Sequence, residues 1–311
     1  MNKIPVWLDC DTGTDDAIAI LCLNSLDSLD LKGISTVCGN TSQNNAFYNT
    51  HRVCGLMNSF YPVFPGADTP LRQELVIATA FHGENGLGNV ELPVPDNAVI
   101  NSENGWDALY RTARELSGEL RLIATGPLTN IATAFLKYPD LPELLHSILI
   151  MGGSTTVGNV TPAAEFNIHT DACAAEIVFR SSDRIYMFGL NATLQEWLSA
   201  KDLDELEATG TKCGKFAHDC LQRALSSLSV IGLPGVSMHD SCPVLYLVYP
   251  ELFEMERAGV YVETKGEITL GKTVTDLYSD KQFERKNAEV CTFIDREEFI
   301  RILKDCVIRN G

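Results

Sequence analysis

The sequence predicts an α/β protein built on an open, mostly parallel, twisted sheet with helices on both faces. Two observations lead to this fold class. Short apolar, β-branched runs alternate with longer helical patterns through the N-terminal two-thirds of the chain. The 311 residues, 45% of them hydrophobic and 21% charged, suit one large soluble domain with a well-filled core.

The alternating segments form five successive strand and helix pairs. Strands are expected at residues 4–8, 31–37, 120–124, 147–151 and 185–190. Helices are expected at residues 16–29, 44–58, 128–137, 171–180 and 200–207. Because each strand is followed by a helix, neighbouring strands should run parallel and be joined by right-handed crossovers.

The C-terminal part of the chain has a different pattern. Residues 259–278 alternate in strand fashion around two glycines, which predicts a β-hairpin. An apolar helix is expected at residues 243–249, a last strand near 289–294 and a last helix at 296–308. We find no linker, low-complexity segment or internal repeat, so residues 1–311 are interpreted as a single domain.

Two long segments carry glycine, asparagine and proline without a helical or strand pattern, at about residues 66–99 and 152–170. Long loops in a compact domain are usually functional or disordered.

Charge and cysteine content exclude several classes of function. The formal charge of −17 argues against a nucleic-acid partner, because such binding depends on cationic contacts to phosphate. The ten cysteines are scattered singly, so zinc ribbons and thioredoxin-type motifs have no support and the thiols are expected to be reduced. Signal-peptide and membrane-spanning patterns are missing from the sequence, which favours a cytoplasmic protein.

The acidic turn Asp9-Cys10-Asp11-Thr12-Gly13-Thr14-Asp15-Asp16 follows the first strand. Helix capping and the helix dipole account for Asp15 or Asp16, which is the purely structural interpretation. They do not account for Asp9 and Asp11, which precede the helix. Four carboxylates within eight residues repel one another unless a cation joins them, and calcium tolerates irregular oxygen cages. We therefore predict a divalent-metal site.

Other polar groups follow the expected strands, where open α/β sheets bind ligands. They are Gly39-Asn40, Thr125-Gly126-Pro127, the loop with Asn159, Glu165 and Asn167, and His239-Asp240. These motifs hold no lysine or arginine, and no P-loop or G-x-G-x-x-G pattern is present, so phosphate is not the obvious ligand. Residues 9–13 fit the D-x-D-x-[GT] pattern, which is similar to that of haloacid-dehalogenase-type phosphatases. These phosphatases remain an alternative, although their later lysine and acidic pair find no match.

Several motifs, taken together, resemble the inosine–uridine-preferring nucleoside hydrolase family across about 240 residues. They are LDCDTGTDDAIAI (8–20), Gly39-Asn40, HGENGLG (82–88), ATGPLTNIA (124–132), IMGGS (150–154), GNVTPAAEFNI (158–168) and MHD (238–240). The resemblance implies a Rossmann-like mixed sheet of about eight strands, assembled as a homodimer or homotetramer. It also implies hydrolysis of ribonucleosides such as uridine, cytidine or inosine to ribose and free base, in nucleoside salvage.

The resemblance further implies roles for single residues. Asp11, Asp16, the carbonyl oxygen of Thr125 and Asp240 would bind Ca²⁺, and Asp11 would also be the general base. The ribose-holding residues would be Asp15, Asn40, Asn159, Glu165, Asn167 and Met151. His239 would face the departing base together with His82, although His82 could equally be a solvated loop residue. Such a site suits the positive charge that develops on the sugar as the N-ribosidic bond breaks.

The sequence departs from the family pattern at three places. Thr12 stands where many relatives have proline, and residues 191–194 read Asn-Ala-Thr-Leu where relatives often read Asp-x-Thr-His. Residues 222–234 contain no aromatic side chain, although relatives often reach over the nucleobase from this region. The choice between pyrimidine and purine bases therefore stays open, as does a nucleoside-binding homologue that has lost turnover.

Overall fold

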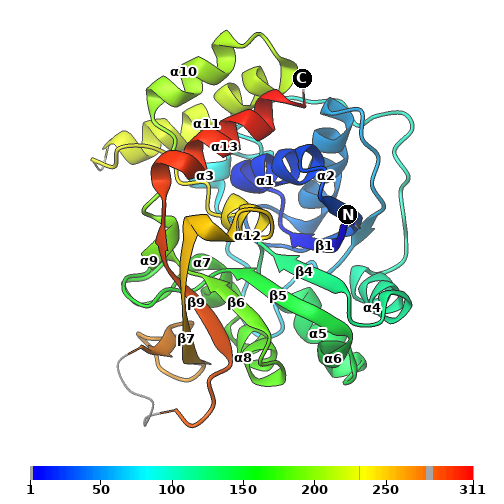
Figure 1. The fold of residues 1–311 in the computed structure, drawn as a ribbon, viewed down its shortest axis with the longest axis vertical. Helices are drawn as coiled ribbons and strands as arrows, with labels where there is room; N and C mark the ends of the chain where they lie inside the picture. Colours follow the sequence, from blue (N-terminus) through cyan, green and yellow to red (C-terminus); the bar gives the residue numbers. More distant parts are fainter. Residues whose placement is uncertain (1–2, 231, 278–282, 311) are drawn as a thin grey trace.

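The computed structural model describes residues 3–230, 232–277 and 283–310. Its centre is a nine-stranded sheet in the order β3-β2-β1-β4-β5-β6-β9-β7-β8 (Figure 1). The strands are β1 (Ile4–Cys10), β2 (Leu29–Thr36), β3 (Val63–Pro65), β4 (Leu120–Ala124), β5 (Leu145–Met151), β6 (Ile185–Phe188), β7 (Phe253–Val262), β8 (Thr273–Asp276) and β9 (Ala288–Ile294).

All strands from β3 across to β9 pair in parallel, whereas β7 runs antiparallel to both of its neighbours. The chain leaves β1 toward β2 on one side and later returns to β4 on the other side of β1. Doubly wound sheets bind ligands in a crevice at such a reversal, which in this chain lies at the carboxyl ends of β1 and β4. The register brings Asp9 of β1 opposite Ser35 of β2 and Ala124 of β4.

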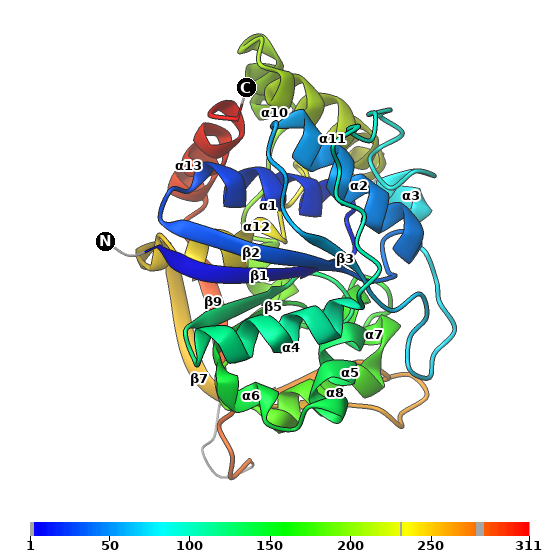
Figure 2. The ribbon, with the colours of Figure 1, turned by 90° about the vertical axis from the view of Figure 1, so that its right-hand side faces the viewer.

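Helices cover both faces of the sheet. One face carries α1 (Thr14–Ser25), α2 (Gln43–Leu56), α10 (Ala200–Ala208), α11 (Lys212–Val230), α12 (Ser241–Tyr246) and α13 (Arg296–Ile308) (Figure 1). The other carries α4 (Gly105–Leu116), α5 (Thr129–Lys137), α6 (Leu141–Leu144) and α8 (Ala172–Ser181) (Figure 2). The short helices are α3 (Thr79–His82), α7 (Phe166–Thr170), α9 (Leu190–Thr193) and the 3₁₀ turn η1 (Pro250–Leu252).

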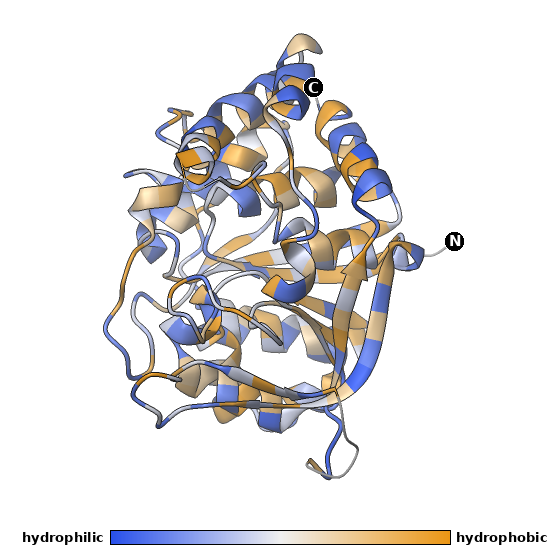
Figure 3. Ribbon diagram, turned by 90° about the vertical axis from the view of Figure 1, so that its left-hand side faces the viewer, coloured by the Kyte–Doolittle hydropathy of each residue, from blue (hydrophilic) through white to orange (hydrophobic). Residues whose placement is uncertain are grey.

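The sheet separates two apolar cores, and hydrophobic residues concentrate on the strands between the helical layers (Figure 3). Successive residues of β1 point into different cores, because Trp7 packs among the residues of one core and Leu8 among those of the other. Both side chains are fully buried. A strand buried on both faces reads as a continuous apolar run, as β1 does.

The predicted fold class is confirmed, with nine strands where about eight were expected. The 259–278 hairpin is present as the antiparallel pair of β7 and β8, with Gly259 opposite Asp276; Tyr278 lies outside the described residues. The edge strand β3 and the helices α4 and α11 were not predicted, and neither were the short helices α3, α6, α7 and α9. The first helix begins at Thr14 and ends at Ser25, since Leu29 already belongs to β2.

Among the described residues, none of the helices is long and apolar enough to cross a membrane. All ten cysteines are free thiols.

Candidate active site

The turn between β1 and α1 places three acidic side chains at the crevice. Asp11 lies just after β1, and Asp15 and Asp16 lie in the first turn of α1, where the helix dipole favours negative charge. The Gly13 amide donates a hydrogen bond to Asp16 (2.8 Å) and so begins the helix. Asp11 and Asp16 are completely buried. Buried carboxylates without a cation are costly, so a positive partner would stabilise this turn.

Carboxylate oxygens from distant parts of the chain meet here. One oxygen from each of Asp15, Asp16 and Asp240 lies within 4.8 Å of the others. Asp15 Oδ1 and Asp240 Oδ2 are buried and have no hydrogen-bond partner among the described residues. Burial raises the pKa of Asp11 and Asp240 well above the usual range, and the neighbouring carboxylates raise it further. Inward-facing oxygens without partners fit a hard divalent cation.

Asn40, which follows β2, holds Asp11 and Asp16 together. Its backbone amide donates to Asp11 Oδ2 (2.6 Å). Its Nδ2 lies 3.2 Å from Asp11 Oδ1 and 3.2 Å from Asp16 Oδ2. The chain approaches so closely that a Cβ at Gly39 would collide with Asp11 Oδ2, which explains the glycine before Asn40. Asn40 therefore fixes the orientation of both carboxylates.

Thr125, which follows β4, contacts the same cluster from the other side. Its hydroxyl donates to Asp16 Oδ1 (2.8 Å). Its carbonyl oxygen accepts a hydrogen bond from Asn167 Nδ2 (2.7 Å), which also lies 3.2 Å from the carbonyl of Met151. The ends of β4 and β5 are thus joined through one side-chain amide.

Glu165 organises the loop between β5 and α7. One of its oxygens accepts from the Asn167 amide (2.8 Å), and the other accepts from the amides of Gly153 (2.9 Å) and Ile168 (3.1 Å). Burial raises the pKa of Glu165 to about 7. Asn159 lies on the exposed part of this loop, where its Oδ1 accepts from the Phe166 amide (2.9 Å).

Two histidines flank the acidic cluster. His82, the last residue of α3, accepts the Thr14 amide proton at Nδ1 (3.2 Å), and that nitrogen lies 4.0 Å from Asp15 Oδ1. Burial lowers the pKa of His82 to about 4. His239 precedes Asp240, and its Nδ1 lies 2.7 Å from the Thr193 hydroxyl. Burial also lowers the pKa of His239. Both rings are therefore held through Nδ1, which leaves Nε2 for other contacts.

The structure brings Asp11, Asp15, Asp16, Asn40, Thr125 and Asp240 together at one crevice. It also places Met151, Glu165 and Asn167 on the β5 side of that crevice, with Asn159 farther out on the loop. Every residue predicted from the sequence for the site is in one of these groups or is one of the two histidines. Their roles stay predictions.

Sequence reasoning missed several residues that support these groups. Thr193 contacts His239, and fully buried Glu196 accepts the backbone amide of Met238 (2.9 Å). Asp9 Oδ2 accepts from Ser35 Oγ and from Asn130 Nδ2 (2.8 Å). Asp9 itself was singled out in the acidic turn, and only its partners Ser35 and Asn130 were missed. The strand register was the available signal for Ser35, because Asp9 of β1 and Ser35 of β2 lie opposite each other.

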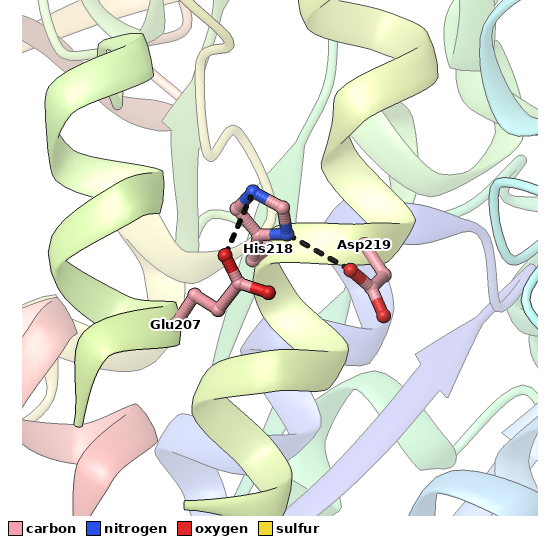
Figure 4. A group of neighbouring side chains, drawn as sticks. All are labelled: Glu207, His218 and Asp219. Atoms are coloured by element: carbon pink, nitrogen blue, oxygen red, sulfur yellow. Dashed lines mark hydrogen bonds and ion pairs between the residues drawn. The ribbon is translucent and has the colours of Figure 1, made fainter. Parts of the chain in front are cut away.

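A second cluster of possible metal ligands lies on the surface, where α10 meets α11. His218 Nδ1 lies 2.8 Å from Asp219 Oδ1, and its Nε2 lies 3.7 Å from Glu207 (Figure 4). Lys215 forms ion pairs with both carboxylates, at 2.9 Å to Asp219 and 3.6 Å to Glu207. The negative charges already have a cation, so this group is a surface ion-pair network.

Comparisons with known proteins agree with this geometry. The model of the family "inosine-uridine preferring nucleoside hydrolase" matches residues 6–301. The chain is 37% identical over 305 residues to the pyrimidine-specific ribonucleoside hydrolase RihA of Escherichia coli (strain K12), with 97% of each chain covered.

Solved structures of other proteins are also similar to this chain. A purine-preferring ribonucleoside hydrolase from Gardnerella vaginalis has a TM-score of 0.91 and 28% identity, with 98% of both chains covered. A plant nucleoside hydrolase, the PpNRh1 enzyme, has a TM-score of 0.91 and 31% identity, with 97% of this chain and 98% of that chain covered.

Proposed function

Because this chain belongs to the inosine-uridine preferring nucleoside hydrolase family, we propose that it hydrolyses the N-glycosidic bond of ribonucleosides with the help of Ca²⁺. Water adds its hydroxyl group to C1′ of the sugar, the bond to the base breaks, and the base leaves with a proton. The observation that carries this proposal is the buried cluster at the end of β1, in which oxygens of Asp15 and Asp240 have no hydrogen-bond partner among the described residues.

Asp11, Asp16, the Thr125 carbonyl and Asp240 would hold the cation, with Asp15 beside them. Oxygen donors of mixed carboxylate and carbonyl type are what calcium prefers. When bound, Ca²⁺ would supply the positive charge that orients sugar hydroxyl groups and makes a neighbouring water more acidic.

Asp11 would accept the proton of the attacking water. Its carboxylate is already oriented by two hydrogen bonds from Asn40, at 2.6 and 3.2 Å, so little reorganisation is needed. Cleavage of an N-ribosidic bond develops positive charge on the sugar ring. The carboxylates and side-chain amides around the crevice would stabilise that charge.

Asn40, Asp15, Asn159, Glu165, Asn167 and Met151 would hold the ribose. The bonds that Glu165 makes to three backbone amides keep the β5 loop in one conformation before substrate arrives. This preorganisation reduces the conformational entropy that is lost when the substrate binds.

His239, with His82 nearby, would face the base. Its Nδ1 is held by Thr193, so the opposite ring nitrogen is the atom that can transfer a proton to the departing base. General-acid assistance of this kind is typically worth ~10²–10⁴-fold in rate.

Pyrimidine nucleosides such as uridine and cytidine are the substrates we favour, because RihA, 37% identical to this chain, is a pyrimidine-specific ribonucleoside hydrolase. Inosine is the purine alternative. We further propose that the protein is cytoplasmic, forms a homodimer or homotetramer, and serves nucleoside salvage.

The test is a nucleoside panel. Purified protein is incubated with uridine, cytidine, inosine and adenosine, with and without a calcium chelator, and free base and reducing sugar are measured. We expect equal amounts of base and ribose from uridine, and loss of both with chelator. No ribose from any nucleoside would refute the proposal, and saturable binding without turnover would show a nucleoside-binding protein.

A further inference from the structure

We propose that the β7–β8 hairpin positions the sugar-binding side of the site, through Thr273 and Lys272. This inference rests on the proposed function. The hairpin is at the far edge of the sheet, with β7 three places and β8 four places from β5 in the strand order, and none of its residues belongs to the predicted site. Its connecting segment nevertheless runs toward α7, beside the loop that follows β5 (Figure 2).

Thr273, the first residue of β8, is hydrogen-bonded to both backbone groups of Ser154. Its hydroxyl accepts from the Ser154 amide (2.8 Å) and donates to the Ser154 carbonyl (2.8 Å). Both residues are 1% exposed. A single hydroxyl thus satisfies a buried donor and a buried acceptor of a loop, and each would be expensive to leave without a partner.

Lys272 adds a second attachment to the same loop. Its ammonium group donates to the Ser154 carbonyl (3.1 Å) and to the Thr156 carbonyl (2.7 Å). Burial lowers the pKa of Lys272, so partial removal from water is the main influence on this group. Charged donors make stronger hydrogen bonds than neutral ones. Two successive residues of the hairpin, Lys272 and Thr273, therefore hold the loop.

Gly153 packs closely against Thr273, so the contact between the loop and the hairpin depends on a glycine at position 153. Gly153 has φ = +76°, and a Cβ there would lie 2.7 Å from Thr273 Cγ2. Gly153 is also the residue whose amide donates to Glu165 Oε2 (2.9 Å). The hairpin thus contacts the loop directly beside the Glu165 carboxylate.

A continuous series of contacts leads from the hairpin to the metal site. Thr273 holds Ser154, the neighbouring Gly153 holds Glu165, and Glu165 holds the Asn167 amide (2.8 Å). The Asn167 side chain then donates to the Thr125 carbonyl (2.7 Å). Loss of the Thr273 hydroxyl should therefore displace Glu165 and Asn167, two residues proposed to hold ribose. Thr273 is a positioning residue, because it is not itself predicted to contact the substrate.

The experiment compares Thr273→Val with Thr275→Val. Thr275 lies on the same strand, and its buried hydroxyl has no hydrogen-bond partner among the described residues, so it is a matched control. Uridine hydrolysis and thermal unfolding are measured for both variants. We expect Thr273→Val to lower kcat/KM by about 10–100-fold, the range usual for loss of outer-shell partners of a metal site. The loss should appear mainly in KM, because Glu165 and Asn167 are proposed to hold ribose. Thr275→Val should behave like the wild type.

Three further variants separate the positioning role of Thr273 from general damage to the fold. Thr273→Ser keeps the hydroxyl and should restore most of the activity. In a Glu165→Gln background, Thr273→Val should cost much less than in the wild type, because both changes affect the same contacts. If Thr273→Val is too unstable to assay, Lys272→Met, which keeps the aliphatic stem, should raise KM in the same direction.

Equal kinetics for Thr273→Val and Thr275→Val would overturn the inference, as would full additivity with Glu165→Gln. Failure of the proposed function gives a different result, since the wild type would then release no ribose from any nucleoside. In that case uridine binding, measured by calorimetry for the same variants, decides whether the hairpin positions the loop.

Discussion

The hydrogen bond between Thr193 and His239 can be removed with almost no change of shape, by Thr193→Val. The hydroxyl lies 2.7 Å from His239 Nδ1, and Thr193 is fully buried. Water cannot readily replace a partner in such a position. The variant therefore leaves one ring nitrogen of His239 without its orienting contact, while Asp240 and the rest of the acidic cluster are unchanged.

The expected magnitude follows from the cost of an unpaired polar atom. Leaving a buried hydrogen-bonding group unsatisfied costs about 1–3 kcal/mol. Every ~1.4 kcal/mol corresponds to a factor of ten in an equilibrium. If this free energy is lost each time the His239 ring adopts its productive orientation, uridine turnover should fall by roughly 5–150-fold. Thr193→Ser keeps the hydroxyl and should lose far less.

The assay compares two leaving groups. Uridine needs a proton on its departing base, whereas a 4-nitrophenyl riboside releases a stable anion that needs none. We expect Thr193→Val to reduce kcat for uridine and to leave kcat for the nitrophenyl riboside nearly unchanged. Equal losses with both substrates would show that the Thr193 hydrogen bond does not act through proton donation by His239.

Three other predictions concern the acidic cluster and its surroundings. Asp11→Asn should abolish measurable release of reducing sugar from uridine while circular dichroism shows a folded protein; activity near the wild-type level would exclude Asp11 as the base. Calcium at about 100 times its Kd should stabilise the wild type by ~2.7 kcal/mol, or about 4 °C in Tm at this chain length, and Asp240→Asn should show a much smaller shift in calorimetry. Burial raises the pKa of Glu196 above 4.5, so the folded state binds a proton that the unfolded state releases, and stability falls as pH rises above that value. Glu196→Gln keeps an acceptor for the Met238 amide and should lose less stability as pH rises above 4.5 in urea unfolding; identical pH slopes would contradict this.

Much of the fold was predictable because its signals are local. Alternation of apolar runs with helical patterns identified most strands and helices, and the glycine-flanked alternation near the C-terminus identified the hairpin. The three-residue strand β3 is too short for a periodic pattern, since it forms only because it pairs with the edge of β2. The end of the first helix was misplaced because pairing of Leu29 with Ile4 prevails over helical preference.

The site was predictable to the extent that its residues follow strand ends. Asp11, Asn40 and Thr125 meet because the carboxyl ends of parallel strands meet. Contacts between residues far apart in the chain were not predictable, such as the bond of His239 to Thr193, 46 residues away. The support of Asp9 by Asn130, 121 residues away, is of the same kind. Such contacts depend on the tertiary arrangement and leave no periodic signal in one sequence.

Calcium titration of metal-free protein tests whether ribose release depends on a cation bound at the acidic cluster. Calcium binding is followed by calorimetry, and ribose release from uridine is followed in parallel under the same conditions. We expect one binding site per chain and ribose release that rises from zero with the same half-saturation as binding. Full ribose release in the thoroughly chelated protein, or calcium binding that leaves ribose release unchanged, would contradict it.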